Sequence, residues 1–208
     1  MFEKSVEELT ELGAQITTAE IAQQPELWRD TLNIYRENKE AIETFLAEAR
    51  AMGEGRLSVV FTGAGTSDYV GDTCAPYLRH AGNTDLYDFK PIATTDIVSA
   101  PRDFLRAEDP TLVVSFARPE SLAAVAVAKE LVHNVKFLNI TCAPEGKLAV
   151  ESADDPNALT LLIPRANDKG FAMTGSYSCM TLLSTLIFDE ASEEQKAEWV
   201  ETIAKMGE

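Results

Sequence analysis

The sequence predicts an α/β protein: a three-layer α/β/α sandwich with a mainly parallel sheet, preceded by N-terminal helices. Three observations lead to this fold class. After about residue 56, short apolar, β-branched runs alternate with helical patterns, which is typical of a parallel sheet with helices on both faces. The first fifty residues instead carry the three- and four-residue spacing of amphipathic helices. A chain of 208 residues that is 45% hydrophobic can build the core of one full domain without disulfides.

The N-terminal segment is expected to hold two helices. Thr18 followed by Glu20 resembles a threonine cap with an acidic first turn, and Pro25 suits the first turn of a second helix. Beyond it, apolar residues at steps of three or four, or their sums, predict one long amphipathic helix: Leu27, Trp28, Leu32, Tyr35, Ile42 and Leu46. The domain body or a partner subunit must cover this stripe. We expect a homodimer or higher homo-oligomer, with self-packing as the alternative.

The remaining elements follow in order. The strands are expected at 57–62, 112–116, 135–140 and 159–163, with a weaker one at 86–89. Helical patterns lie between them at 69–80, 121–132 and 174–188. A charged helix with Trp199 and Ile203 on one side forms the tail. We therefore divide the chain into a helical arm (1–52), a ligand-binding domain (53–190) and a C-terminal helix (191–208).

Composition excludes several classes of protein. The formal net charge of −16 argues against nucleic-acid binding, which depends on a basic surface. No window reaches the ~18 apolar residues of a membrane helix, and residues 1–10 are too charged for a secretory signal. Cys74, Cys142 and Cys179 cannot all pair, so we expect reduced, buried thiols in a cytoplasmic protein. No ligand cluster predicts a metal, and no cofactor is implied.

A glycine-rich turn follows the first predicted strand. Gly63 and Gly65 allow a tight turn and a close approach of the backbone to a ligand. Thr66 and Ser67 add hydroxyl groups beside the free N–H groups at the start of the next helix, which together favour an anion site. A purely structural βα turn is the alternative. The third glycine of a dinucleotide fingerprint and the GK[ST] of a Walker loop are both absent, so a nucleotide-binding domain is disfavoured.

This turn and its surroundings resemble a known family. The segment Phe61-Thr-Gly-Ala-Gly-Thr-Ser-Asp-Tyr-Val-Gly-Asp72 is similar to the opening unit of SIS (sugar isomerase) domains. The closest similarity is to the tagatose-6-phosphate ketose/aldose isomerase-like family, which is related to galactosamine-6-phosphate deaminases. The resemblance extends to residues 18–28, 141–142 and 170–174, and so covers essentially the whole chain. It implies a phosphorylated sugar, a hexose or hexosamine 6-phosphate, as the ligand.

The resemblance also implies site residues. Thr66 and Ser67 match positions that contact the sugar phosphate in SIS domains. Arg118 matches the position before a second phosphate loop and Ser121 matches a residue that opens the next helix, although the Ser-Gly-x-Ser expected between them is absent. Either this loop is truly shorter, which would weaken phosphate binding, or a mobile loop is missing from the sequence, which we favour. The alternative role for Arg118 is a surface salt bridge.

A third turn of the resemblance, Ala172-Met-Thr-Gly-Ser176, opens the last long helix, and relatives place this turn at the sugar. Ala172 and Thr174 are its candidate contacts. For Thr174 and Ser176, helix capping is nearly as good an interpretation.

The resemblance leaves the catalytic residues unassigned. Relatives carry two SIS domains, and their glutamate base and ring-opening histidine come from the second domain or a neighbouring subunit. His80 and His133 match neither role; we expect a helix C-terminal position for the first and a surface position for the second. Glu120 is expected to stabilise a helix start rather than to act as a base. The segment 191–208 would then begin a linker to a second SIS domain.

Two functions are therefore expected. The first is the sugar-phosphate-binding domain of a hexose-6-phosphate aldose/ketose isomerase or an amino-sugar-6-phosphate deaminase. The alternative is a non-catalytic SIS domain that senses a sugar phosphate.

Overall fold

A five-stranded, all-parallel sheet forms the centre of the molecule. The computed structural model describes residues 4–116 and 121–208. The strand order is β2-β1-β3-β4-β5. Strand β2 therefore lies on one side of β1, and the chain then crosses to the other side, where β3, β4 and β5 follow in order. The strands are β1 (Leu57–Thr62), β2 (Tyr87–Pro91), β3 (Thr111–Phe116), β4 (Val135–Thr141) and β5 (Ala158–Leu162). Strands β1 and β3 are buried along their whole length, as expected for central strands covered on both faces.

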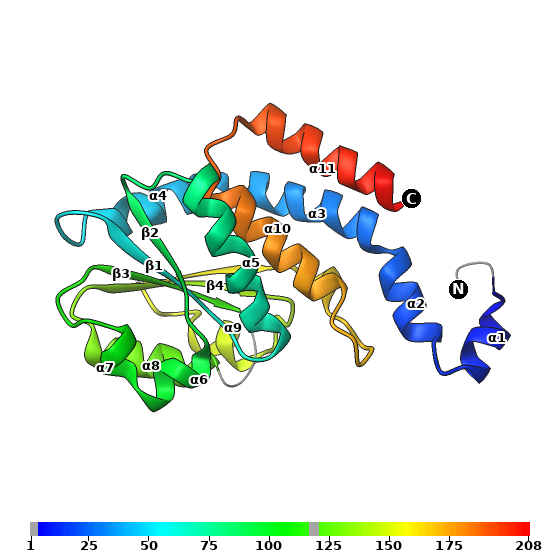
Figure 1. The fold of residues 1–208 in the computed structure, drawn as a ribbon, viewed down its shortest axis with the longest axis horizontal. Helices are drawn as coiled ribbons and strands as arrows, with labels where there is room; N and C mark the ends of the chain where they lie inside the picture. Colours follow the sequence, from blue (N-terminus) through cyan, green and yellow to red (C-terminus); the bar gives the residue numbers. More distant parts are fainter. Residues whose placement is uncertain (1–3, 117–120) are drawn as a thin grey trace.

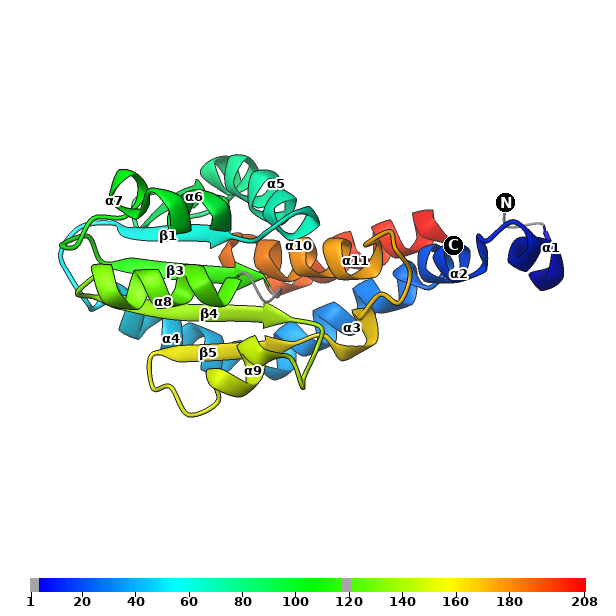
Figure 2. The ribbon, with the colours of Figure 1, turned by 90° about the horizontal axis from the view of Figure 1, so that it is seen from below.

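Helices cover both faces of the sheet, as Figure 2 shows. One face carries α3 (Gln24–Glu37), α4 (Lys39–Arg50), α5 (Thr66–Ala81) and α10 (Gly175–Phe188). The other carries α6 (Thr94–Ser99), α7 (Pro101–Phe104), α8 (Ser121–Leu131) and α9 (Lys147–Glu151). A short 3₁₀ helix spans Pro164–Ala166. The predicted three-layer α/β/α sandwich is confirmed.

Two helical segments lie outside these layers. Helices α1 (Val6–Glu11) and α2 (Gln15–Ala22) project from one end of the body, and α11 (Glu193–Gly207) lies along α3 (Figure 1). The ion pairs Arg29–Glu201 (2.8 Å) and Arg36–Glu193 (3.1 Å) join α3 to α11. Helix α11 buries Val200 and Ala204 and leaves Trp199 and Ile203 exposed. The tail is thus a helix, as predicted, but its two large apolar residues face away from the body.

The strand predictions agree with the structure to within two residues at each end. Helices α5, α8, α10 and α11 also lie where the apolar spacing predicted them. The short elements α6, α7 and α9 and the 3₁₀ helix were not predicted. Each contains six residues or fewer, too few for a 3.6-residue period to be visible.

Two expectations about the N-terminal helices are wrong. Thr18 is not a cap: α2 already begins at Gln15, and the Thr18 hydroxyl donates to the Ala14 carbonyl 2.7 Å away, a bond that threonine can make inside a helix. The predicted long helix is two helices. Asn38 separates them, and its side-chain amide (2.8 Å) and its backbone N–H (3.1 Å) both donate to the Ile34 carbonyl at the end of α3.

The apolar stripe on these helices is covered by the chain itself. Leu27, Leu32 and Tyr35 of α3, and Ile42 and Leu46 of α4, are buried in the same core as the sheet. Trp28 is partly buried, and its indole N–H donates to the Ser178 hydroxyl of α10 at 3.0 Å. The self-packing alternative is therefore the correct one for this stripe, and the stripe gives no reason to expect a dimer.

The remaining expectations concern exposure. All three cysteines are buried and unpaired, as predicted. His80 lies in the last turn of α5, and His133 is at the surface beside Glu108. No helix within the described residues is both long and apolar enough to cross a membrane.

Candidate functional site

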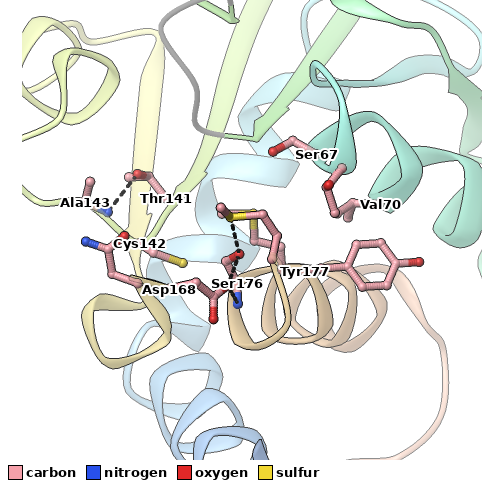
Figure 3. Close-up of a pocket in the computed structure, with 12 residues that line it drawn as sticks. Ser67, Val70, Thr141, Cys142, Ala143, Asp168, Ser176 and Tyr177 are labelled. Carbon is pink, nitrogen blue, oxygen red and sulfur yellow. Dashed lines mark hydrogen bonds between the residues drawn. The ribbon is translucent and has the colours of Figure 1, made fainter. Parts of the chain in front are cut away.

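A small, partly open pocket lies at the carboxyl ends of the strands. It lies where the chain order reverses beside β1, the position at which doubly wound sheets bind ligands. Figure 3 shows the side chains converging from α5, β4 and α10. The lining residues are Thr66, Ser67, Val70, Thr141, Cys142, Ala143, Asn167, Asp168, Met173, Ser176, Tyr177 and Met180.

The turn between β1 and α5 needs both of its glycines. A Cβ on Gly63 would lie 2.4 Å from the carbonyl carbon and oxygen of Ser67, so only glycine lets the helix start this close to the strand. Gly65 has a φ of 59°, in the region that favours glycine, and a Cβ there would meet nothing within 4 Å. Gly63 is thus required by packing, whereas Gly65 is required by backbone conformation and leaves the start of α5 open.

Thr66 and Ser67 form the first turn of α5 and line the pocket. The N-cap position is Gly65, which brings no capping side chain. The first N–H groups of a helix have no partner within it and carry the positive end of its dipole. This turn therefore offers N–H and hydroxyl donors to an anion.

The end of β4 forms the floor of the pocket. Thr141 is buried, and its hydroxyl oxygen accepts from the Ala143 N–H at 3.1 Å, which shapes the turn. Burial raises the pKa of Cys142 to about 12 and that of Cys179, behind it in α10, to about 11. Both groups are therefore protonated thiols at neutral pH, which disfavours a nucleophilic role.

The opposite wall is the start of α10, and Asp168 organises it. The carboxylate accepts from the backbone N–H groups of Thr174, Gly175 and Ser176 at 2.9–3.1 Å. It also accepts from the hydroxyls of Thr174 (3.3 Å) and Ser176 (2.5 Å). This side chain supplies the cap that the N-cap residue Thr174 does not provide.

Glu20 of α2 fixes the other end of the same loop. Its buried carboxylate accepts from the N–H groups of Lys169 (2.5 Å) and Gly170 (3.0 Å). A Cβ on Gly170 would come within 2.6 Å of this carboxylate. The loop from Asn167 to Thr174 is thus held by two carboxylates, one from the projecting helix α2 and one from the loop itself.

The structure brings together only some of the predicted site residues. Thr66 and Ser67 line the pocket, and Gly63 and Gly65 shape the turn that presents them. Thr174 lies beside the pocket, with its hydroxyl and N–H directed to Asp168. Ala172 is exposed and is not among the lining residues.

The predicted second phosphate loop falls at the gap between β3 and α8 in the described residues. Arg118 and Glu120 lie outside the described residues. Ser121 is the first residue of α8.

Sequence reasoning missed Asp168, Asn167 and Tyr177, whereas Met173 and Ser176 belong to the predicted third turn. One signal could have identified Asp168: in a chain with 34 acidic residues, it is the only one between Asp155 and Asp189. An isolated carboxylate shortly before a Thr-Gly-Ser helix start is a candidate cap. Tyr177 gave no such signal; its hydroxyl forms a hydrogen bond with Thr73 of α5 at 2.7 Å, a contact that depends on the tertiary structure.

The charge of the pocket is unusual for an anion site. Within the described lining, Asp168 is the single charged side chain. The described residues also contain no group of three or more His, Cys, Asp or Glu side chains that could hold a metal ion. An anion bound here would depend on helix N–H groups and hydroxyls, which can hold a phosphate without a basic side chain.

The fold and the pocket together define a doubly wound α/β domain with a pocket at its switch point. No family profile matches the chain. It is 40% identical, over 91% of its own length and 50% of the relative's, to a D-galactosamine-6-phosphate deaminase, AgaS, of Shewanella sp. strain ANA-3. A crystal structure from Clostridium novyi NT superposes with a TM-score of 0.88 at 40% identity, covering 97% of this chain and 51% of that one.

A second crystal structure, of tagatose-6-phosphate ketose/aldose isomerase from Escherichia coli, has a TM-score of 0.80 at 33% identity. It covers 90% of this chain and 50% of that one. The chain belongs to the SIS-domain phosphosugar isomerase family. It spans about half the length of each of these relatives.

Proposed function

We propose that this chain is the sugar-phosphate-binding part of an enzyme that isomerises or deaminates a hexose or hexosamine 6-phosphate. One observation carries the proposal: the uncapped start of α5, at Gly65–Ser67, opens into the pocket at the switch point of the sheet. A phosphate there would accept hydrogen bonds from helix N–H groups and from the hydroxyls of Thr66 and Ser67. The names of the relatives, a deaminase and a ketose/aldose isomerase, support the same class of substrate.

The pocket suggests how the sugar would lie. With the phosphate at the start of α5, the sugar carbons would extend toward Cys142 at the floor of the pocket and Ser176 on the opposite wall, whose positions Figure 3 shows. A proton transfer between neighbouring sugar carbons requires a poised base and a group that polarises the carbonyl. The one carboxylate of the described lining, on Asp168, is already engaged by five hydrogen bonds. The base would therefore come from another domain or subunit.

A second candidate function is a sugar-phosphate sensor without catalysis. The absence of a free acid or base within the described lining favours it. The two functions differ in one measurement: only an enzyme converts the bound sugar phosphate when the complete protein is assayed.

Thermal unfolding with and without ligands tests the binding proposal. Hexose 6-phosphates, including tagatose 6-phosphate and galactosamine 6-phosphate, should raise the midpoint, because a ligand that binds only the folded state stabilises it. Free hexoses should not. Ser67→Ala should abolish most of the shift, whereas Thr84→Ala, an exposed position outside the pocket, should retain it. No shift with any sugar phosphate would contradict the proposal.

Two further aspects belong to this proposal. The three unpaired, buried thiols support a reducing compartment such as the cytoplasm. Helix α11 exposes three apolar side chains at helical spacing, those of Trp199, Ile203 and Met206. The stripe on α3 and α4 is buried, so this exposed patch is the surface that supports a homo-oligomer. Sedimentation at micromolar concentration tests this, and a monomer would contradict it.

A further inference from the structure

Two helix N-termini face the same pocket, and they differ in one respect. Ser67 marks the start of α5, where no side chain caps the helix and the one first-turn carboxylate, on Asp68, does not line the pocket. Ser176 marks the start of α10, where the carboxylate of Asp168 does both. We infer that Asp168 is a positioning residue: it closes the α10 end of the pocket to phosphate and turns Ser176 into a hydrogen-bond acceptor for the sugar. The inference rests on the proposed function, because it assigns the two ends of a sugar phosphate to the two ends of the pocket.

Asp168 takes the first three N–H groups at the tip of α10, those of Thr174, Gly175 and Ser176. Oδ2 of Asp168 accepts from the N–H groups of Thr174 (3.1 Å) and Ser176 (2.9 Å), and Oδ1 accepts from Gly175 (3.0 Å). A Cβ on Gly175 would lie 3.2 Å from Oδ1, so glycine at this position allows the carboxylate to come close. The anion site of this helix is already occupied by a negative charge from the chain itself.

The first consequence is electrostatic. A phosphate near Asp168 would meet like-charge repulsion instead of the attraction that a free helix N-terminus provides. At the start of α5 no carboxylate lines the pocket. The phosphate is therefore directed to Gly65–Ser67, and the sugar to α10.

The second consequence concerns Ser176. A serine hydroxyl has one proton and two acceptor lone pairs. The Ser176 hydroxyl gives its proton to Oδ2 of Asp168 at 2.5 Å, yet the side chain still lines the pocket. Toward a ligand, the Ser176 hydroxyl oxygen can therefore act only as a hydrogen-bond acceptor. The matching ligand groups are donors: a sugar hydroxyl or a protonated amino group, and not a phosphate or carboxylate.

Binding of two probes to Asp168→Asn tests this inference. The amide keeps the shape of the side chain but removes the charge, so inorganic phosphate should bind roughly three- to tenfold more tightly. The ratio of the affinity for galactosamine 6-phosphate to the affinity for inorganic phosphate should fall at least fivefold, because the Ser176 hydroxyl no longer has a carboxylate to hold its proton. Both affinities can be measured by titration calorimetry. Asp85→Asn, an exposed carboxylate away from the pocket, makes the same charge change and should leave both affinities within twofold.

Ser176→Ala provides a second test that leaves Asp168 in place, should Asp168→Asn fold poorly. It should weaken galactosamine 6-phosphate several-fold and leave inorganic phosphate unchanged. If either variant instead weakens both probes in proportion, Asp168 and Ser176 serve only the stability of α10 and the inference is overturned, while the proposed function stands. If the unchanged protein binds neither probe, the proposed function itself fails, and the inference with it.

Discussion

Gly63 determines how closely α5 approaches the sheet. Its missing side chain leaves room for the backbone of Ser67, and the Gly63 carbonyl accepts from the Thr94 N–H at 2.9 Å. The same residue therefore joins β1, the start of α5 and the start of α6. A change at this position should disturb both folding and the anion site.

We expect Gly63→Ala to lower the free energy of unfolding by roughly 2–4 kcal/mol, since a Cβ at 2.4 Å from backbone atoms forces the helix away from the strand. Sugar-phosphate binding should be lost at the same time. Gly55→Ala is the matched control: its φ is 87° and its surroundings are open, so it should lower stability by roughly 1 kcal/mol and leave binding intact. Denaturant unfolding and ligand-induced shifts measure both effects. A Gly63→Ala protein as stable as the unchanged chain would show that the turn tolerates a side chain.

The buried thiols predict how stability depends on pH. Burial raises the pKa of Cys74 and Cys142 to about 12 and that of Cys179 to about 11. In the unfolded chain a thiol ionises near pH ~8.5, so above that pH the unfolded state binds fewer protons than the folded state. Stability should therefore be level below about pH 8 and fall between about pH 9 and 11, by up to roughly 1.4 kcal/mol per pH unit for each thiol.

A triple Cys→Ala variant should show a clearly smaller fall over this range, measured by urea unfolding at each pH. Some dependence should remain from tyrosines such as Tyr77, because burial raises its pKa to about 12. An unchanged slope in the triple variant would assign the whole effect to other groups.

At the scale of elements, helix α2 holds the loop that precedes α10. Its contact with the loop is the buried Glu20 carboxylate, which accepts from the backbone of Lys169 and Gly170. Phe171, the next residue, is fully exposed. The loop therefore presents an aromatic side chain to a protease while its backbone is fixed.

We expect Glu20→Ala to speed chymotrypsin cleavage after Phe171 by several-fold, because two backbone N–H groups lose their acceptor and the loop opens more often. Sugar-phosphate binding should weaken as well, since this loop carries Asp168. Glu11→Ala removes an exposed carboxylate of α1 and serves as the control. Equal cleavage rates in the two variants would mean that Asp168 alone fixes the loop.

At the scale of the whole molecule, charge is the dominant feature. The chain carries 34 acidic and 18 basic residues, for a formal net charge of −16. Such an excess destabilises the compact state by self-repulsion, which salt screens. The ion pairs between α3 and α11 act in the opposite direction, but their partly exposed side chains make them weak.

The thermal midpoint should therefore rise by about 2–5 °C between 10 and 300 mM sodium chloride, which corresponds to roughly 1–2 kcal/mol for a chain of this size. Tetramethylammonium chloride should give the same rise if screening, and not sodium binding, is the cause. A fall in the midpoint would show that the ion pairs outweigh the repulsion.

The sequence alone predicted the sheet and the glycine turn because both depend on local patterns. A buried parallel strand requires a short β-branched run, and the close approach of α5 to β1 requires glycine at residue 63. The long helix at residues 25–46 was only half right, since one apolar stripe is compatible with a straight helix and with two helices that share a face.

What only the tertiary structure decided is which surfaces meet. The spacing of Leu27 and Ile42 required a cover, but it could not show that the sheet and α10 of the same chain provide it. Likewise, Asp168 lies six residues before Thr174 in the sequence, and its capping of α10 follows from the path of the loop held by Glu20. Local sequence determines backbone preference and amphipathic faces within a few residues, whereas pairing of those faces and convergence of side chains on a pocket depend on the packing of the whole chain.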